Sequence, residues 1–285
     1  MDPTHPAPVR PEADQQVSEE RARRASSFGT AAAAYAEHRP DYALAAIRWA
    51  LEPIAGLTGP PRLLDLGAGT GKLTGQLTGL MMDRGRPEVI AVEPDPKMLG
   101  ELRRQVPGVA AMEGSAEAIA LPDASVDAVL AGQAAHWFDL DRALPEIARV
   151  LRPGGVFAGL WNADDDRVDW VAGLHEVSGR RTVTAELSAR NSEQDDDGPL
   201  ARWLRGSGER LFLPFTEAMF DHSQARTAAS LVQTLGTHSM FLIMEPAERE
   251  TVLGQVRGFL AETPQTASGE FGWPLVTLAM RAVRR

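Results

Sequence analysis

The sequence predicts a doubly wound α/β fold around a mostly parallel sheet. Between residues 62 and 161, short apolar runs alternate with segments of helical periodicity, which is the pattern of parallel strands joined by helices. The first run ends in three alternating glycines, and the second ends in a glutamate. Open α/β sheets bind ligands at the carboxyl ends of their strands, so both features predict a ligand site at that edge.

The segment Arg62–Thr74 is predicted to form a strand, a tight turn and the start of a helix. Its apolar run Leu63–Leu66 is followed by alternating glycines, Gly67, Gly69 and Gly71. Leucines then recur at helical spacing from Leu73 onwards. Glycine has no side chain, so this turn can take positive φ and let a ligand approach the backbone closely.

The spacing of these glycines distinguishes between classes of nucleotide ligand. A phosphate loop needs a glycine where Leu66 stands and a Ser or Thr where Leu73 stands, and the dinucleotide pattern needs a third glycine in place of Lys72. The next strand, Glu88–Val92, leads directly into Glu93. A carboxylate at that point can accept hydrogen bonds from both hydroxyls of a ribose. The residues therefore favour an adenosine-like ligand over a pyrophosphate.

Three further strands continue the alternation. They are predicted at Val109–Met112, Val126–Leu130 and Val156–Trp161. The helix before the first of them starts at Pro94-Asp95-Pro96 and turns Met98 inward. The helix before the third presents Leu144 and Ile147 on one face and ends at Arg152–Gly155. Alternation this regular implies right-handed crossovers.

The pattern loosens after residue 161. A short apolar helix is expected at Val168–Val177, and the polar, charged segment Gly179–Pro199 is expected to be a surface loop. Its Asp195-Asp196-Asp197 run is typical of a solvated loop, so no metal site is predicted. The remaining elements are a sixth strand, two helices and a last strand, at Leu213–Phe220, Ala225–Leu235, Pro246–Ala261 and Trp273–Ala282.

Length and composition set the outer bounds. The 285 residues, 44% of them hydrophobic, suit one large domain or one domain with an insertion. No apolar run approaches the ~18 residues of a membrane span, and no signal peptide precedes the fold, so we expect a cytoplasmic protein without a membrane partner. The absence of cysteine excludes disulfides and thiolate chemistry. A net charge of −10 disfavours nucleic acid as a partner.

The N-terminal part divides into two segments. Residues 1–26 are polar and rich in Pro, Glu and Arg, which predicts a disordered or loosely helical tail before a domain at 27–285. Residues 27–58 contain both tyrosines of the protein, Tyr35 and Tyr42, followed by an amphipathic helix. Two interpretations stay open: a helix packed on the sheet with half-buried tyrosines, or a lid that lays the tyrosine hydroxyls and Arg39 over the ligand.

The chain resembles the class I S-adenosyl-methionine-dependent methyltransferases, and among them the small-molecule group often called methyltransferase type 11. The resemblance covers roughly 28–285. It rests on the segments Leu63–Gly71, Val89–Asp95, Gly114–Glu117, Gln133–Asp139 and Leu151–Gly155. It implies a Rossmann-like, seven-stranded, mostly parallel sheet whose last strand is antiparallel. It also implies an N-terminal helical lid at 27–58 and a cap insertion after the fifth strand at 162–212.

The resemblance also implies a site for S-adenosyl-methionine. The turn would hold the aminocarboxypropyl end of the cofactor through Gly67, Ala68, Gly69 and Gly71. Asp65 would lie near its ammonium group, Tyr35 and Arg39 would close over its carboxylate, and Gln133 would lie beside the sulfonium.

For the adenosine end, the resemblance places Glu93 on the ribose hydroxyls. Pro94 and Met98 would flank the adenine ring, although ordinary helix core is an open alternative for Met98. The edge of the adenine would meet Ser115, Ala116 and Glu117.

The acceptor side is less determined. His136 is the candidate general base, and shaping the wall of the pocket is the alternative; His38 and His238 are further candidates. Tyr42 is expected at the acceptor pocket. Three tryptophans would line that pocket, with core packing as the competing reading for each: Trp137, Trp161 and Trp170.

The predicted function is transfer of a methyl group from S-adenosyl-methionine to an O, N or C atom of a small-molecule metabolite, with S-adenosyl-homocysteine as product. The alternative within the same fold is a cyclisation or another reaction of the bound cofactor. A non-enzymatic cofactor-binding protein and a nicotinamide oxidoreductase are the rivals from other classes. The acceptor and the oligomeric state are not predicted.

Overall fold

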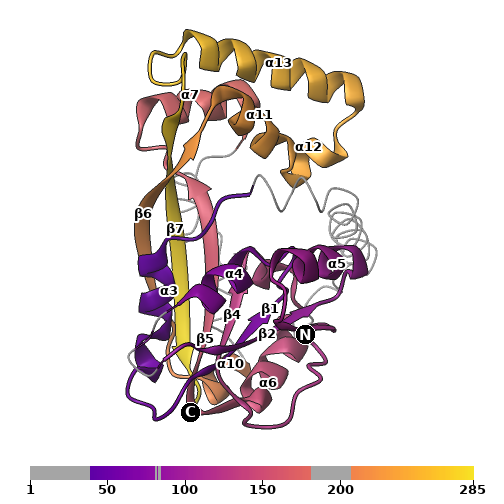
Figure 1. The fold of residues 1–285 in the computed structure, drawn as a ribbon, viewed down its shortest axis with the longest axis vertical. Helices are drawn as coiled ribbons and strands as arrows, with labels where there is room; N and C mark the ends of the chain where they lie inside the picture. The colour runs from indigo at the N-terminus through magenta and orange to yellow at the C-terminus, as the bar shows by residue number, and fades with distance from the viewer. Residues whose placement is uncertain (1–38, 81, 83–84, 181–206) are drawn as a thin grey trace, which may run out of the picture.

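The seven strands that the structure describes form one sheet in the order β3-β2-β1-β4-β5-β7-β6. The computed structural model describes residues 39–80, 82, 85–180 and 207–285 (Figure 1). The strands are β1 Arg62–Leu66, β2 Glu88–Glu93, β3 Ala110–Glu113, β4 Val126–Gly132, β5 Leu151–Asp164, β6 Thr216–Arg226 and β7 Phe271–Val283. Strands β1 to β5 run parallel, and β7 is antiparallel to both β5 and β6. The predicted seven-stranded, mostly parallel sheet with an antiparallel last strand is therefore confirmed.

The strand order reverses at β1, which lies between β2 and β4. This reversal is the switch point at which open α/β sheets leave a crevice beyond the ends of their strands. The glycine turn follows β1 directly, so the fold places the predicted ligand turn at the crevice.

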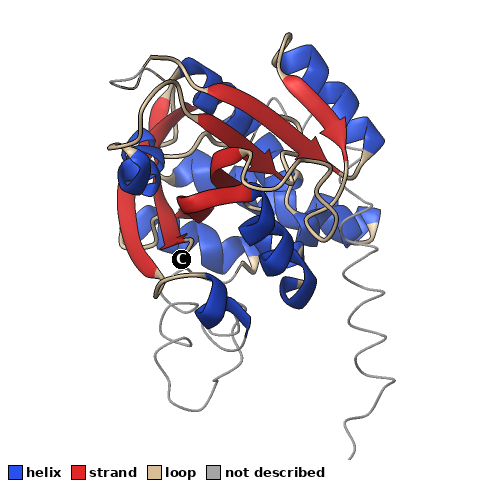
Figure 2. Cartoon of the chain, turned by 90° about the horizontal axis from the view of Figure 1, so that it is seen from below, coloured by secondary structure: helices blue, strands red, loops and turns tan. Residues whose placement is uncertain are grey.

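Helices cover both faces of the sheet (Figure 2). One face packs against α3 Leu44–Leu51 and α4 Lys72–Gly79, and the other packs against α6 Leu140–Val150. Neighbouring residues of β1 show the division: Leu63 packs in the hydrophobic cluster that contains α3 and α4, and Leu64 packs in the cluster that contains α6. Two further helices join these layers, α5 Pro96–Gln105 and α10 Ser207–Leu211.

Helix α3 packs on the sheet, as in the first of the two interpretations of the N-terminal segment. Ile47 and Ala50 are fully buried against β5 and β7, and Tyr42, just before the helix, is also buried. Tyr35, His38 and the 1–26 tail lie outside the described residues, as does most of the predicted 179–199 loop.

Strand β6 lies further along the chain than the sequence pattern places it. The prediction was Leu213–Phe220, whereas β6 runs from Thr216 to Arg226 and pairs with β7 along its whole length. As an edge strand with alternating exposure it carries polar residues such as Asp221 and Gln224, so its second half lacks an apolar signal. The next helix, α11 Ala228–Gly236, consequently starts after the predicted Ala225 and has Thr227 as its N-cap.

A layer of helices lies beyond the end of β5 (Figure 1). It consists of α7 Asp169–Ser178, α11, α12 Ser239–Ile243 and α13 Pro246–Glu262. Their buried apolar faces form one cluster with Trp273 and Leu275 of β7. The sequence analysis named 162–212 as the cap insertion; three of these helices come from the connection between β6 and β7, the part of the chain that contains the candidate His238.

A hydrogen-bonded side chain joins α3 to the far half of the sheet. The Thr277 hydroxyl, fully buried on β7, donates to Asn162 Oδ1 at 2.6 Å and accepts from the Ala43 backbone N–H at 2.9 Å. Nε2 of His222 on β6 lies 3.1 Å from the same oxygen. Thr277 therefore connects the segment before α3 with three strands.

Thr277→Val keeps the shape of this side chain and removes its hydroxyl. We expect the free energy of unfolding to fall by about 1–3 kcal/mol, because the Ala43 N–H and the Asn162 oxygen lose a buried partner. Urea denaturation measures the change. The matched control Thr251→Val, on the exposed face of α13, is expected to stay within about 0.5 kcal/mol of the parent; equal effects of the two would contradict the role of Thr277.

Candidate functional site

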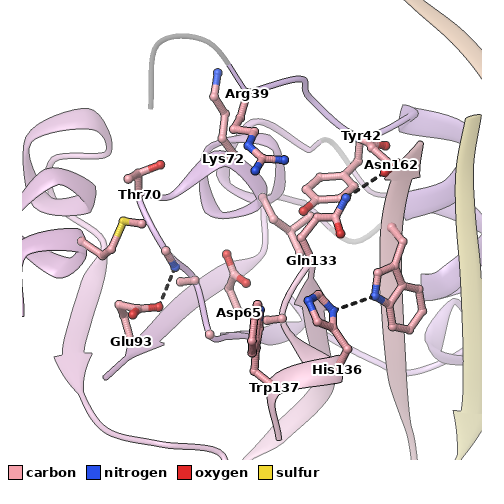
Figure 3. A pocket seen from close by; sticks show the side chains of 18 of the residues that line it. Arg39, Tyr42, Asp65, Thr70, Lys72, Glu93, Gln133, His136, Trp137 and Asn162 are labelled. Carbon is pink, nitrogen blue, oxygen red and sulfur yellow. Dashed lines mark hydrogen bonds between the residues drawn. The ribbon is translucent and has the colours of Figure 1, made fainter. Parts of the chain in front are cut away.

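A cavity of about 810 Å³ lies over the carboxyl ends of β1, β2, β4 and β5 (Figure 3). Its volume falls in the range of small-molecule and cofactor sites. Of the residues that the sequence singles out, its lining contains Arg39, Tyr42, Asp65, Gly67, Ala68, Gly69, Glu93, Pro94, Met98, Ser115, Ala116, Glu117, Gln133, His136, Trp137, Trp161 and His238. The fold thus brings together side chains from most of the predicted motifs.

The glycine turn between β1 and α4 is held against β2. The backbone N–H groups of Gly67 and Ala68 both donate to the Val92 carbonyl, at 2.8 and 3.0 Å. Gly67 has a φ of +70°, and a Cβ there would lie 2.7 Å from the side chain of Ala134. Gly71, with a φ of +89°, packs against Leu102 of α5 and does not line the cavity. Its glycine is needed for the turn and for helix packing.

Asp65 has a buried carboxyl group, and one of its two oxygens accepts no hydrogen bond from the described residues. It is fully buried, and its Oδ2 accepts from the Thr74 hydroxyl at 2.6 Å. Its Oδ1 has no hydrogen-bond partner among the described residues. Burial, assisted by the negative charge of Glu93, raises the pKa of Asp65 from 3.8 to about 7. A cationic amine in the cavity would supply both the missing partner and the missing countercharge.

Glu93 ends β2 with both carboxylate oxygens already fixed by backbone amides. Oε2 accepts from the Gly69 N–H at 2.8 Å (Figure 3). Oε1 accepts from the Asp95 N–H at 2.9 Å. Burial raises the pKa of Glu93, and these two bonds act in the opposite direction. Each carboxylate oxygen has a second lone pair, so the group can still accept from two neighbouring hydroxyls.

Helix α5 and the segment after β3 close the side of the cavity next to Glu93. Asp95 caps α5 by accepting from the Lys97 and Met98 backbone amides, which fixes Met98 in the first turn. Met98 is buried and lines the cavity, so it belongs both to the helix core and to the site. Across from it, the segment 114–117 is tied to the β4 side by Glu117, whose Oε1 accepts from the Asp139 N–H at 2.9 Å.

Gln133 leaves β4 in a strained backbone conformation. Its φ of +52° is uncommon for a residue other than glycine, and such strain concentrates at functional sites. Its backbone N–H donates to the Leu160 carbonyl and its side-chain amide donates to the Asn162 carbonyl, both at 2.8 Å. These bonds fix Gln133 at the centre of the cavity wall.

His136 accepts a hydrogen bond from the indole of Trp161. Its Nδ1 lies 3.2 Å from the indole nitrogen Nε1, and its ring lies against Trp137 with the ring centroids 4.8 Å apart (Figure 3). An indole N–H can only donate, so Nδ1 accepts, and the neutral imidazole must carry its proton on Nε2. In this tautomer His136 presents a donor at Nε2 and has no lone pair there to accept a proton.

Trp170 is not brought to the cavity, contrary to the acceptor-pocket reading of the sequence. Its indole is buried in the cluster of α7, α11 and α13 and meets the ring of Phe271 edge to face, with centroids 5.7 Å apart. Core packing, the competing reading, describes this residue.

Sequence reasoning missed several cavity residues. Thr70, in the glycine turn, has a buried hydroxyl with no hydrogen-bond partner among the described residues. Lys72 also lines the cavity and pairs with Asp41 at 3.7 Å. Lys72 occupies the position where the dinucleotide pattern has a glycine, and that departure is the signal that could have identified it.

The far end of the cavity contains an ionic cluster that the motifs do not indicate. Asp164, at the end of β5, accepts from His175 Nε2 at 2.8 Å and from Arg180 Nη1 at 2.5 Å. Asp164 and His175 are each only 2% exposed. Burial acts to raise the pKa of Asp164, but Arg180 and His175 hold it below its ordinary value. Asp164 follows a predicted strand, which is a usable signal, whereas the other two depend on how α7 packs.

His238 lies beside this cluster. Burial, together with the nearby charges of Arg39 and Arg180, holds the pKa of His238 well below its ordinary value, so the ring is neutral. Arg39 donates from Nη2 to the Thr237 carbonyl at 3.2 Å, which joins the N-terminal segment to the helical layer. Over the described residues, no group of three or more His, Asp or Glu side chains is arranged to hold a metal ion.

Comparisons with known proteins agree on one family. Residues 64–159 match the family model described as a methyltransferase domain. An uncharacterised methyltransferase of Mycobacterium tuberculosis is 40% identical over 263 residues, spanning 90% of this chain and 95% of that protein. The trans-aconitate 2-methyltransferase of an Azoarcus species is 30% identical over 55% of this chain and 70% of its own length.

A solved structure agrees with the same family. A protein of Anaeromyxobacter dehalogenans described as a type II methyltransferase is 28% identical, with a TM-score of 0.58. The match covers 86% of this chain and 97% of that one. Within the part of the chain that the structure describes, no helix combines the length and apolar character needed to cross a membrane.

The buried carboxyl group of Asp65 predicts a pH-dependent stability difference for Asp65→Asn. In the folded protein the carboxyl keeps its proton up to about pH 7, whereas in the unfolded chain it loses it near 3.8. As the pH rises from 3.8 to about 7, the unfolded chain releases this proton and the folded protein keeps it. The free energy of unfolding of the parent therefore falls, relative to the variant, by roughly 1.4 kcal/mol for each pH unit in this range. Thermal unfolding of ligand-free protein should show Asp65→Asn as the more stable form at pH 8, and the advantage should shrink towards pH 4.

The exposed residue Asp141 on α6 provides the control. Asp141→Asn is expected to change stability by less than about 0.5 kcal/mol at either pH. A constant difference between Asp65→Asn and the parent from pH 4 to 8 would contradict the protonated state of Asp65.

Proposed function

The chain belongs to the class I S-adenosyl-methionine-dependent methyltransferases, and from this premise we propose that it methylates an O, N or C atom of a small organic molecule. The observation that carries the proposal is the division of the cavity. Asp65 and Glu93 offer acceptors at one end, and the space continues past Gln133 to Trp161 and His238 at the other. One end suits a cationic nucleoside, which leaves the other for an acceptor. A relative named for trans-aconitate, a small organic acid, supports an acceptor of that size.

We propose that the amino-acid end of the cofactor lies over the glycine turn. The unused Oδ1 of Asp65 is placed to accept from its ammonium group. The unpartnered Thr70 hydroxyl and the cations Arg39 and Lys72 would face its carboxylate. Tyr35, which the sequence analysis grouped with Arg39, lies outside the described residues.

The adenosine end would extend along β2 and α5. Glu93 would accept from the ribose hydroxyls with its remaining lone pairs while the Gly69 and Asp95 amides hold it in place. Met98 and Pro94 would contact one side of the adenine, and the segment 115–117 would contact its edge.

The reaction itself makes modest demands on the protein. S-adenosyl-methionine supplies a methyl group already activated by the positive sulfur, and S-adenosyl-homocysteine remains after transfer. The chain must hold the acceptor in line with that methyl group, and orientation of this kind can lower a barrier by ~7–11 kcal/mol. We propose that Tyr42, Trp137, Trp161 and His238 shape the acceptor space, and that His136 acts there as a donor through Nε2.

Glu93→Ala tests the cofactor site. We expect the affinity for S-adenosyl-homocysteine to fall about 100-fold or more, because hydrogen bonds to a charged group contribute about 1.5–3 kcal/mol each. Isothermal titration calorimetry measures the affinity, and circular dichroism checks the fold. Glu113→Ala removes the exposed glutamate paired with Glu93 in the β2–β3 register and should leave the affinity within about twofold. Equal affinities of Glu93→Ala and the parent would refute the cofactor assignment.

A mass-shift screen tests the reaction. The protein and S-adenosyl-methionine are incubated with a metabolite extract, and we expect a product heavier by one methylene group together with S-adenosyl-homocysteine. A parallel incubation with the cofactor alone is searched for methylthioadenosine, the product expected from cyclisation of the aminocarboxypropyl arm. Methylthioadenosine without any methylated metabolite would replace the proposed methyl transfer with that reaction.

A further inference from the structure

The Asp164–His175 pair lies at the acceptor end of the cavity and has no role in the function proposed above. Both side chains line the cavity, and both are almost fully buried. They come from separate elements, because Asp164 ends β5 and His175 belongs to α7. Among the described residues, the charged or titratable groups around them are Arg180 on Asp164, and His238 and Arg39 next to it.

The hydrogen bond between the two side chains decides the proton positions on His175. The Arg180 guanidinium and the imidazole keep Asp164 ionised despite its burial. An ionised carboxylate only accepts, so Nε2 of His175, 2.8 Å away, must be the donor. In the neutral ring this leaves the lone pair on Nδ1, and Nδ1 is buried without a hydrogen-bond partner.

This tautomer is the opposite of the one that Trp161 imposes on His136. Trp161 donates to Nδ1 of His136 and leaves its proton on Nε2, whereas Asp164 accepts from Nε2 of His175 and leaves Nδ1 unprotonated. Of these two cavity histidines, His136 is therefore a donor and His175 an acceptor. The lone pair of His136 already accepts from Trp161, whereas that of His175 has no hydrogen-bond partner and is available to a general base.

The position of the pair fits an acceptor of modest size. Asn162 accepts from the side chain of Gln133, which we place near the reacting end of the cofactor, and Asp164 lies two residues further along β5. Two residues of strand span about 7 Å. The pair therefore lies about one aromatic ring beyond Gln133, within the same cavity.

We propose that His175 is the general base of the reaction and that the acceptor carries a weakly acidic hydroxyl, of the phenol or enol type. This inference rests on the proposed methyl transfer. The acceptor hydroxyl gives its proton to Nδ1 of His175, and its oxygen uses a lone pair to bond the methyl carbon. The carbon–sulfur bond breaks with its electron pair left on sulfur, and the imidazolium, stabilised by Asp164, later returns the proton to water.

The surrounding charges favour a hydroxyl over an ammonium acceptor. Arg180 lies at this end of the cavity, and its positive charge stabilises the oxyanion that develops as the hydroxyl loses its proton. The same charge disfavours a cationic amine. A carboxylate acceptor would also suit this cation, but it arrives without a proton and needs no base.

The competing explanation is that the Asp164–His175 hydrogen bond only fastens α7 to β5. His175→Gln separates the two explanations, because the glutamine amide can still donate to Asp164 but cannot take up a proton. A purely structural hydrogen bond to Asp164 is therefore kept in His175→Gln, whereas the function of a general base is lost.

The first measurement needs no acceptor. Nitrogen-15 NMR of the histidine side chains, with His175 assigned by its loss in His175→Gln, reports which ring nitrogen carries the proton. In the neutral ring we expect Nε2 protonated and Nδ1 unprotonated, and a change of this pattern in Asp164→Asn. Protonation at Nδ1 of the neutral ring, or a ring that stays doubly protonated from pH 6 to 9, would overturn the proposal.

The second measurement uses panels of phenols, carboxylic acids and primary amines as methyl acceptors, with mass detection. We expect methylation of phenols, and for His175→Gln a kcat lower by about 10²–10⁴-fold with KM and the affinity for S-adenosyl-homocysteine within threefold. In the parent, kcat should fall as the pH is lowered through the protonation of His175 seen by NMR, and the variant should lack this decline. Methylation of carboxylic acids alone, or an unchanged kcat in His175→Gln, would overturn the base while leaving the methyltransferase assignment intact.

Discussion

The attachment of the glycine turn to β2 is the constraint on which the site depends. Gly67 and Ala68 donate to the Val92 carbonyl, and Gly69 donates to Glu93, so the turn and the end of β2 form one unit. A side chain at Gly67 would collide with Ala134 and separate the turn from β4 as well. Because these contacts draw the ends of β1, β2 and β4 together, Asp65 and Glu93 come to share one cavity.

Charge is distributed unevenly along the cavity. The acidic residues Asp65, Glu93 and Glu117 lie towards the glycine turn and β2, together with the cation Lys72. Arg39 and Arg180 lie towards the helical layer, together with the anion Asp164. A ligand that is cationic at its centre is stabilised at the first end, and a group that develops negative charge is stabilised at the second. The chain as a whole has a net charge of −10, so this local polarity cannot be read from the composition. The polarity of the cavity depends on which strand each charged residue lies next to.

The sequence predicts those parts of the fold and site that depend on local patterns. The glycine turn, Glu93 and the alternating strands are encoded in short segments, and the seven-stranded sheet follows from them. The sequence offered His238 as a site candidate, but it does not show how α11 to α13 pack against α7 and β7. Trp170 was misassigned for the same reason, since a tryptophan in an amphipathic helix gives no sign of which partner it faces. The order of the residues likewise does not show that Trp161 fixes the tautomer of His136.

The burial of Asp65 destabilises the ligand-free protein, and a bound ligand can offset that destabilisation. The carboxyl group is buried with one oxygen unused, and its pKa of about 7 means that the protein without ligand keeps a proton there near neutrality. A cation bound beside Oδ1 favours the ionised form and would displace that proton. The same reasoning applies in reverse to Asp164, where Arg180 and His175 already satisfy the charge and no ligand cation is required. Two buried aspartates at the ends of β1 and β5 therefore have different roles: the first is prepared to receive a positive group, and the second is prepared to hold a histidine in one tautomer.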